Sequence, residues 1–502
     1  MNQAILGLSR YVLAIFIAFY TLHCFLTFGV HSEKERGGSY LLQTIFLCVI
    51  HIYGFVVLYL REDNEWMLFF CALQEVLFIG IIALYRVLYP EANRLVLNNM
   101  CLLLAVGFVM LSRLSMGRAL RQFFITVISV GLTLVVPWFM EKRAQLKRYS
   151  WLFGIFGLCA LLAVRIAGSV TNGSTITYSI GGVTFQPSEF VKIIYVLFLA
   201  GVLSGHGVSR GHTPVVNMGS NGGFGEQGAA WENRAGFQPD SGKKGFLGFF
   251  KGESHENRDG FQTDAVYENP IPLSNILPAA GLAAAHVAVL VVSRDLGAAL
   301  IYFIIGLAMI YTATRNRLTV AVGAVLGSVG AVLGYVLFSH VRTRVRAWRD
   351  PFRYIDGQGY QITQSLFAIG TGGWFGMGLT MGSPNKIPVV EQDFIFSAIS
   401  EELGCIFSFC LILICFSTFL MFMNIGMSMR DPFYRLLAVG FATNYIFQVF
   451  LTIGGATKFI PLTGVTLPLV SYGGSSILST LIMFSAVQGI YIMRAKGRGG
   501  RA

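Results

Sequence analysis

The sequence predicts an all-α protein that crosses a membrane many times. Of its 502 residues, 54% are hydrophobic and only 12% are charged, and the mean hydropathy is +0.64. Soluble domains carry about 25% charged residues. The apolar residues are also grouped in blocks of about twenty, which is the length that a helix needs to cross a bilayer. These two observations exclude a soluble globular fold.

The apolar blocks define about thirteen candidate spans. No small-residue cleavage site follows the first block, so we expect a retained span rather than a signal peptide. The candidate spans cover 8–29, 40–60, 67–89, 98–113, 122–140, 151–169, 188–205, 272–292, 294–313, 319–339, 395–424, 432–452 and 474–493.

Basic residues are concentrated in alternate connections between these spans. The connection 141–150, those after residues 313 and 424, and the C-terminal tail are rich in Lys and Arg, whereas 169–188 contains none. The positive-inside rule therefore places the basic connections and the C-terminus in the cytoplasm, and counting back places the N-terminus outside. The basic residues behind the net charge of +12 lie between the spans, where they set the orientation of the protein and contact lipid headgroups. No nucleic-acid partner is therefore expected.

Two connections are long. Residues 205–270 are rich in Gly, Asn and Ser, and we expect a disordered cytoplasmic insertion. The sequence Glu232–Gln238 returns there almost unchanged as Glu256–Gln262, which leaves open a docking motif used twice. Residues 340–394 form the second long connection, a large extracellular loop before the helix that follows Asp393. Its basic character predicts an anionic ligand.

Polar residues near span ends mark a candidate site, because a charge at membrane depth costs about 2.5–3.5 kcal/mol. Glu189 and Lys192 are three residues apart at the start of a span, so they share a helix face and can pair. They either support packing or line an outward cavity. Asp295 either caps a helix or contributes to the same site. Ser471, Gly473 and Gly474 form either a simple turn or a set of exposed backbone amides that bind an anion.

The segment VVEQDFIFSAISEELG carries four acids at the start of an apolar run. Asp393 lies at the mouth of the predicted helix, where a substrate from outside can reach it. Glu401 and Glu402 lie roughly 12–14 Å deeper at helical rise, and we expect them to be buried structural partners. The eight cysteines lie almost entirely in apolar blocks without metal-ligand spacing. These features indicate a carboxylate site for an anionic, lipid-linked substrate, and leave transferase and transporter open.

The motifs, in this order, resemble the SEDS family (RodA/FtsW/SpoVE-like proteins of shape, elongation, division and sporulation), with a RodA-like branch as the nearest match. The motifs are QPSEFVK at 186–192, DLG at 295–297, GYQITQS at 359–365, AIGTGG at 368–373, DFIF at 393–396, EELG at 401–404 and SYGGSS at 471–476. The resemblance covers about 98–495 and implies a ten-helix core. Residues 1–97 then form about three extra N-terminal helices.

The resemblance implies a peptidoglycan glycosyltransferase that polymerises lipid II into glycan strands at the outer face of the bacterial cytoplasmic membrane. It also implies a class B penicillin-binding protein as partner, and Asp393 as the catalytic acid. A flippase for a lipid-linked precursor and a non-catalytic scaffold remain the alternatives. The family pattern often has His-Thr before the Asp, whereas this chain has Glu391 and Gln392, so the role of Glu391 stays open.

The expected chemistry needs positive charge for the departing pyrophosphate, from side chains or from a divalent cation such as Mg²⁺ or Mn²⁺. No metal ligand is assigned from the sequence. The candidate substrate-binding residues are Glu189, Lys192, Arg346, Lys386, Lys458, Ser471, Gly473 and Gly474. Structural or secondary roles are expected for Asp295, Gln364, Ser365, Glu401 and Glu402.

Overall fold

The computed structural model describes the chain except residues 1, 30–32, 143, 168, 172–173, 181–182, 206–272 and 500–502. The described helices and strands belong to one unit of the chain. The insertion expected at 205–270 lies almost entirely outside the described residues, so its disorder and its repeated motif stay predictions.

Every predicted span coincides with a helix, which confirms the prediction of a multi-pass membrane protein. Twelve helical segments in the described part of the chain are long and apolar enough to cross a membrane. The span predicted at 272–292 corresponds to α9, whose apolar stretch is shorter. The α-helices are α1 (Asn2–Gly29), α2 (Glu33–Glu62), α3 (Trp66–Leu88), α4 (Arg94–Leu114), α5 (Met116–Thr133), α6 (Val136–Lys142), α7 (Ser150–Ala167), α8 (Pro187–Gly205), α9 (Leu273–Val292), α10 (Leu296–Thr314), α11 (Arg317–Leu337), α12 (Ser339–Arg349), α13 (Tyr360–Gly372), α14 (Ile395–Met427), α15 (Pro432–Ala456) and α16 (Gly474–Gly499).

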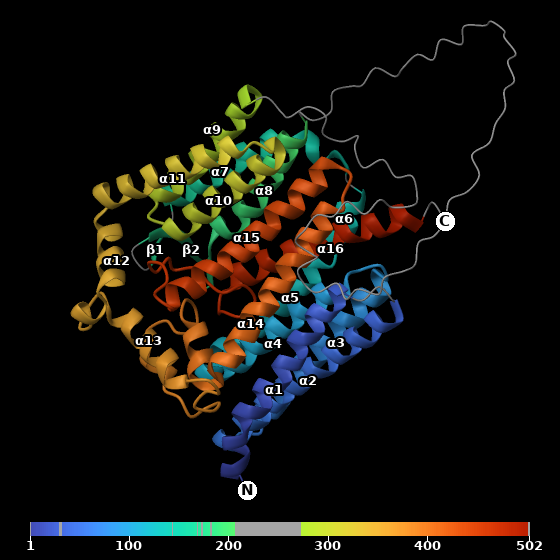
Figure 1. Ribbon diagram of the computed structural model, residues 1–502, viewed down its shortest axis with the longest axis vertical. Coiled ribbons are helices and arrows are strands. Elements are labelled where there is room, and N and C mark those ends of the chain that lie inside the picture. The colour runs from blue at the N-terminus through green and yellow to red at the C-terminus, as the bar shows by residue number, and fades with distance from the viewer. Residues whose placement is uncertain are drawn as a thin grey trace, which may run out of the picture. The chain divides into compact units, whose positions relative to one another are not determined.

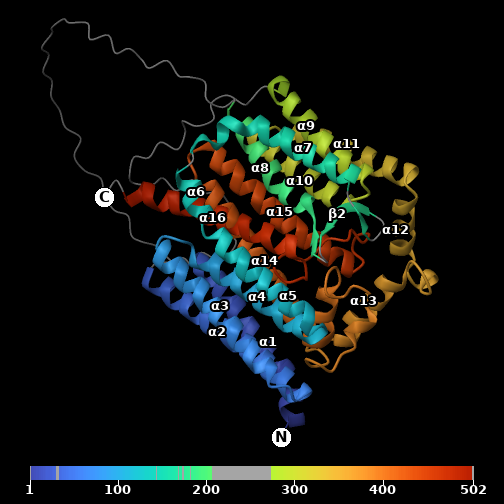
Figure 2. The same ribbon diagram turned by 180° about the vertical axis from the view of Figure 1, so that it is seen from behind.

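Three short strands lie between α7 and α8 and are an addition to the all-α prediction. They are β1 (Ser169–Thr171), β2 (Ser174–Ile180) and β3 (Val183–Phe185), and they pair antiparallel in the order β1-β2-β3 (Figures 1 and 2). The sequence between β1 and β2 is Asn-Gly, the pair typical of two-residue hairpin turns. Strands of three to seven residues are too short to form a twenty-residue apolar block.

Helix α4 is the centre of the helical bundle. All its residues from Leu95 to Ser112 are buried, and it contacts α2, α3, α5, α14 and α16. Its buried Asn99 accepts a hydrogen bond from the Tyr20 hydroxyl of α1 (2.9 Å) and donates one to Ser417 of α14 (2.9 Å). Polar groups inside an apolar bundle need such partners, so Asn99 ties an N-terminal helix to the rest of the bundle. Helices α1, α2 and α3 lie along one flank (Figure 1).

Helix α14 is interrupted at Gly404, where the sequence predicts a continuous helix. Gly404 has a φ of 85°, and a Cβ there would clash with the amide nitrogen of Gly376. The backbone of 373–378 inserts at this break and replaces the missing helical hydrogen bonds. The replacements are Met377 N to Glu401 O, Gly378 N to Glu402 O, Cys405 N to Gly373 O and Ile406 N to Trp374 O.

The connection predicted as a loop at 340–394 contains regular structure. Helices α12 and α13 lie within it, together with two 3₁₀ turns, η3 (Phe352–Tyr354) and η4 (Pro384–Lys386). Helix α12 spans the basic stretch 342–349, which was expected only as part of that large loop. Helix α12 matters for function because its phase decides which arginine faces Asp393.

Candidate functional site

The carboxylate of Asp393 lies at the start of α14, next to the connection between α15 and α16. A Cβ on Gly464 of that connection would lie 3.8 Å from Asp393 Oδ2 and 3.9 Å from Arg344 Nη2. The neighbouring Phe394 and Phe396 are buried. Burial raises the pKa of Asp393 to about 6, and the positive charge of Arg344 opposes this rise. A carboxyl with such a pKa is mostly ionised at neutral pH and can still accept a proton.

Arg344 of α12 is the cation that the structure brings to Asp393. Its Nη1 donates to the carbonyls of Leu462 (3.3 Å) and Thr463 (3.2 Å), so the guanidinium is held over the connection that carries Gly464. Arg346, the candidate expected from the sequence, is exposed. Residues two apart on a helix point about 200° away from each other. This spacing indicates that Arg344 and Arg346 cannot both face the site.

Glu189 and Lys192 form the ion pair that their spacing predicts. Lys192 Nζ donates to Glu189 Oε2 (2.7 Å) and to Gln448 Oε1 of α15 (2.8 Å). Glu189 also accepts a hydrogen bond from Ser479 of α16 (3.0 Å). Gln448 in turn donates to the carbonyl of Thr466 (3.0 Å). The pair therefore joins three helices to the connection that lies beside Asp393.

Asp295 is both a helix cap and a member of the charged group. Its Oδ1 accepts from the amide of Ala298 (3.0 Å), while its Oδ2 is buried and has no hydrogen-bond partner among the described residues. The pKa of Asp295 is raised to about 6, mainly by burial and to a lesser extent by Glu189, while the hydrogen bond from the Ala298 amide and the charges of Arg344 and Lys192 lower it. The capping and site interpretations are therefore compatible. The charges of Arg344 and Lys192 both act on Asp295.

Ser471 supports the main chain that precedes Asp393. Its hydroxyl donates to the carbonyl of Gln392 (2.5 Å) and accepts from the amide of Leu467 (2.9 Å). The amide of Gly473 donates to the side chain of Gln122 (3.2 Å), and Gly474 is the first residue of α16. Ser471 and Gly473 therefore form hydrogen bonds with other protein groups, and these bonds position the α15–α16 connection.

Three other predicted cations lie apart from the Asp393 carboxylate. Arg346 and Lys386 are exposed. Lys458 is half-buried, and its carbonyl accepts a hydrogen bond from the Trp348 indole (3.1 Å). In the described part of the chain, none of the three shares a hydrogen bond or ion pair with Asp393.

The remaining acids of the segment lie in different surroundings from Asp393. Glu391 forms an ion pair with Arg118. Glu402 is fully buried and accepts from Arg113 Nε (3.1 Å). Glu401 accepts from the amide of Ser383 (2.9 Å). Each of these acids has a protein partner, whereas Asp393 faces an arginine across a glycine.

Ser365 links three helices beneath the site. Its hydroxyl lies 2.6 Å from the hydroxyl of Ser397 of α14 and donates to the carbonyl of Ala456 at the end of α15 (2.7 Å). The adjacent Gln364 is half-buried on α13. These contacts connect the long α11–α14 connection to the helix that begins after Asp393.

Comparison with protein families gives a match over most of the chain. Residues 93–218 and 262–495 match the FtsW/RodA/SpoVE family, whose description is "cell cycle protein". Part of the insertion between residues 205 and 270 lies outside this match.

Similar proteins and solved structures agree with the family match. The chain is 31% identical over 466 residues to the peptidoglycan glycosyltransferase RodA of Mycobacterium tuberculosis, covering 90% of this chain and 89% of that protein. It is 31% identical to the probable peptidoglycan glycosyltransferase FtsW of Neisseria gonorrhoeae, covering 72% and 75%.

Two solved structures share the fold. One, from a study of polymerization and crosslinking by a peptidoglycan synthase complex, has a TM-score of 0.56 at 23% identity and covers 80% of this chain and 98% of that one. The other is the rod shape determining protein RodA of Thermus thermophilus, with a TM-score of 0.50 at 20% identity, covering 80% and 96%.

Proposed function

Because this chain belongs to the FtsW/RodA/SpoVE family, we propose that it polymerises lipid II with Asp393 as the general base. The family membership confirms the resemblance seen in the sequence motifs. The chain is a peptidoglycan glycosyltransferase embedded in the membrane by many helices. The observation that carries the residue assignment is the carboxylate of the half-buried Asp393, which faces Arg344 across Gly464 and whose pKa is raised to about 6.

The reaction requires one proton transfer and one exchange of bonds at the anomeric carbon. The acceptor sugar hydroxyl gives its proton to Asp393 as its oxygen forms a bond to the anomeric carbon of the donor. The bond from that carbon to the pyrophosphate oxygen breaks, and undecaprenyl pyrophosphate leaves with the electron pair. A positioned general base contributes typically 10²–10⁴-fold. The pyrophosphate is already a good leaving group, so a second catalytic carboxylate is not needed.

Positive charge near Asp393 supports the binding of the pyrophosphate. Arg344 is held by carbonyls of the connection beside Asp393, and Lys192 is held by Glu189 and Gln448. Fixed cations stabilise charge that develops on a leaving group without having to reorganise. We assign this role to Arg344 first and to Lys192 second.

A divalent cation is compatible with the residues near the site. The described residues contain no group of three or more His, Cys, Asp or Glu placed to hold a metal. However, Mg²⁺ is commonly bound by one or two carboxylates together with substrate phosphates. Asp295, whose Oδ2 has no partner among the described residues, is the residue that would hold such an ion. The ion would neutralise charge on the pyrophosphate.

Charge and family membership support the proposed orientation and partner. The basic connections support a cytoplasmic C-terminus and an outer position for Asp393. The fold similarity to a chain from a study of a peptidoglycan synthase complex supports a penicillin-binding protein as partner. Such a partner would cross-link the strands that this chain polymerises.

The test is polymerisation of fluorescent lipid II by the purified protein, with and without a class B penicillin-binding protein and with Mg²⁺ or Mn²⁺. Asp393→Asn should abolish the glycan ladder, while Asp356→Asn, a change of an exposed acid on the same connection, should not. A ladder of wild-type intensity from Asp393→Asn would refute the assignment of the base. A vesicle assay of lipid II flipping, run in parallel, tests the transporter alternative.

A further inference from the structure

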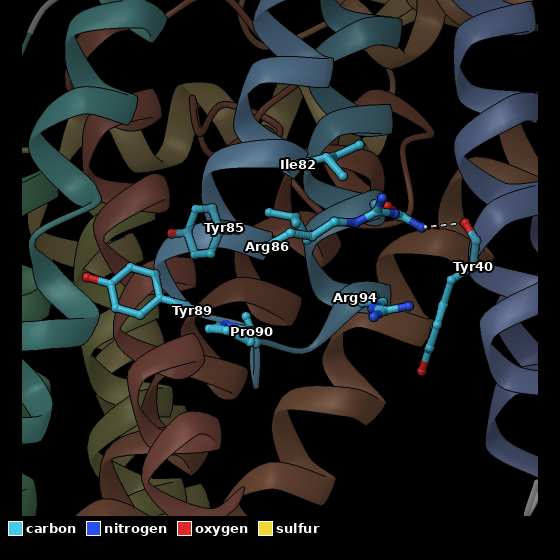
Figure 3. A pocket seen from close by; sticks show the side chains of 10 residues that line it. Tyr40, Ile82, Tyr85, Arg86, Tyr89, Pro90 and Arg94 are labelled. Atoms are coloured by element: carbon cyan, nitrogen blue, oxygen red, sulfur yellow. Dashed lines mark hydrogen bonds between the residues drawn. The ribbon is translucent and has the colours of Figure 1, made fainter. Parts of the chain in front are cut away.

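A pocket lies where α2, α3 and α4 meet. The proposed glycosyltransferase reaction does not use this pocket. Its lining includes Tyr40 of α2, Arg86 of α3, Tyr89 and Arg94. In Figure 3 the side chains of Arg86 and Arg94 both extend across the pocket toward α2. Two positive charges therefore share one small concave site.

In the described part of the chain, the side chains of Arg86 and Arg94 take part in no hydrogen bond or ion pair, although the charge of Arg94 acts on Tyr40. Two other polar groups in the lining are bonded within the protein. The Tyr89 hydroxyl donates to Leu134 O (2.6 Å), and the Asn98 amide donates to Tyr40 O (3.1 Å), the contact drawn in Figure 3. The groups left free are chiefly hydrogen-bond donors with positive charge, which predicts an anionic ligand.

The position of the pocket selects a lipid over a soluble anion. Arg86 lies in the last turn of α3 and Arg94 is the first residue of α4, and both helices are candidate membrane spans. Next to Arg86, Val87 and Leu88 expose 77% and 52% of their surface, as expected for side chains in contact with acyl chains. The arginines therefore lie at the level where a bilayer places its phosphates.

The end of the bundle on which the pocket lies is the basic one. Tyr89 is within electrostatic reach of Glu141 and Lys496, which form an ion pair (2.7 Å) beside the basic connection 141–150. The positive-inside rule assigns this end to the cytoplasmic leaflet, where anionic lipids are abundant. Basic pockets between membrane helices on this side are suited to anionic headgroups.

We propose that the pocket between α2, α3 and α4 binds the phosphate of an anionic phospholipid through Arg86 and Arg94. Such a lipid bridges α2 and α3 to α4, the buried centre of the bundle. Its role is to hold the N-terminal helices against the core, and it does not depend on the identity of the catalytic residues.

Native mass spectrometry of the detergent-purified protein tests this proposal by titration with phosphatidylglycerol or phosphatidylcholine. We expect one tightly retained phosphatidylglycerol and weaker phosphatidylcholine. Each arginine near an anionic headgroup contributes about fivefold, so R86Q/R94Q should weaken retention about thirtyfold. R86K/R94K should keep most of the affinity. The matched control R148Q/R317Q, which removes two exposed arginines that do not line this pocket, should bind like wild type.

Three results would overturn the proposal. They are wild-type retention of phosphatidylglycerol by R86Q/R94Q, equal retention of both lipids by the wild type, and displacement of the lipid by millimolar inorganic phosphate. The last result would identify a free phosphate as the ligand. If size-exclusion chromatography shows that the double variant does not fold, the single variants R86Q and R94Q replace it. Each is then expected to bind about fivefold more weakly, and wild-type binding by both would refute the assignment.

Discussion

Arg344 and Asp393 face each other across Gly464, where a Cβ would lie less than 4 Å from an oxygen of one and a nitrogen of the other. The arginine is held by main-chain carbonyls of the α15–α16 connection, and the aspartate lies at the start of α14. The arrangement couples the ionisation of the carboxylate to a cation on a different helix.

The first prediction concerns the pH dependence of polymerisation. Burial places the pKa of Asp393 at about 6, and a general base acts only when deprotonated. The rate should therefore be constant above this pH and fall about tenfold per unit below it. The initial rate of lipid II consumption, measured between pH 4.5 and 8.5, shows this fall, which is the acidic limb of the pH–rate profile. A profile without an acidic limb would contradict the assignment.

The second prediction concerns Arg344. Its charge lowers the pKa of Asp393, so Arg344→Gln should move the acidic limb to higher pH. It should also slow the reaction at pH 8 by roughly 10²-fold, because a fixed donor to the pyrophosphate is lost. Arg344→Lys should retain part of the rate. Arg346→Gln, on the exposed side of α12, should leave the position of the limb unchanged; a shift in that variant would favour the sequence-based choice of Arg346.

The third prediction concerns Glu189. Glu189→Gln keeps the shape of the side chain and its contacts with Lys192 and Ser479, but removes the charge. Because charged hydrogen bonds contribute about 1.5–3 kcal/mol, we expect a folded protein whose activity is about ten- to a hundredfold lower. Glu141→Gln, which changes the exposed pair with Lys496, is the control and should remain active. If Glu189→Gln has wild-type activity, the ion pair of Glu189 and Lys192 contributes only to packing.

The fourth prediction concerns the break in α14. Gly404→Ala forces a Cβ into a backbone conformation with φ of 85° and against the amide of Gly376. We expect a loss of stability of about 1–3 kcal/mol, visible as a lower melting temperature in detergent. Gly330→Ala, at an exposed helical position with nothing within 4 Å, should be neutral or stabilising. Equal melting temperatures for the two variants would show that the insertion of 373–378 contributes little.

The fifth prediction concerns the buried ion pair of Arg113 and Glu402. Arg113→Gln leaves a carboxylate with no exposed surface without its cation, at a cost of about 3–5 kcal/mol. The double variant Arg113→Gln/Glu402→Gln should recover much of this loss, because no buried charge is left unpaired. Lys496→Gln breaks an exposed pair and should cost less than about 1 kcal/mol. Thermal unfolding of the three variants gives the comparison, and a double variant no more stable than Arg113→Gln would contradict it.

The sequence alone was sufficient for the helical spans, the family and the pairing of Glu189 with Lys192. Hydropathy is a property of consecutive residues, because each residue contributes separately to the cost of entering a bilayer. The ion pair is equally local, since positions three apart share a helix face. The short β1–β3 sheet escaped detection because its strands are far shorter than any span.

Only the tertiary structure decided which groups meet. The choice of Arg344 over Arg346 depends on the helical phase of α12 and on carbonyls more than a hundred residues away. The break at Gly404 depends on the backbone of 373–378, and the pocket of Arg86 and Arg94 depends on how α2 packs against α3 and α4. These features arise from contacts between distant segments, whose geometry is set by the packing of whole helices. The order of residues therefore determines the spans, while packing determines the site.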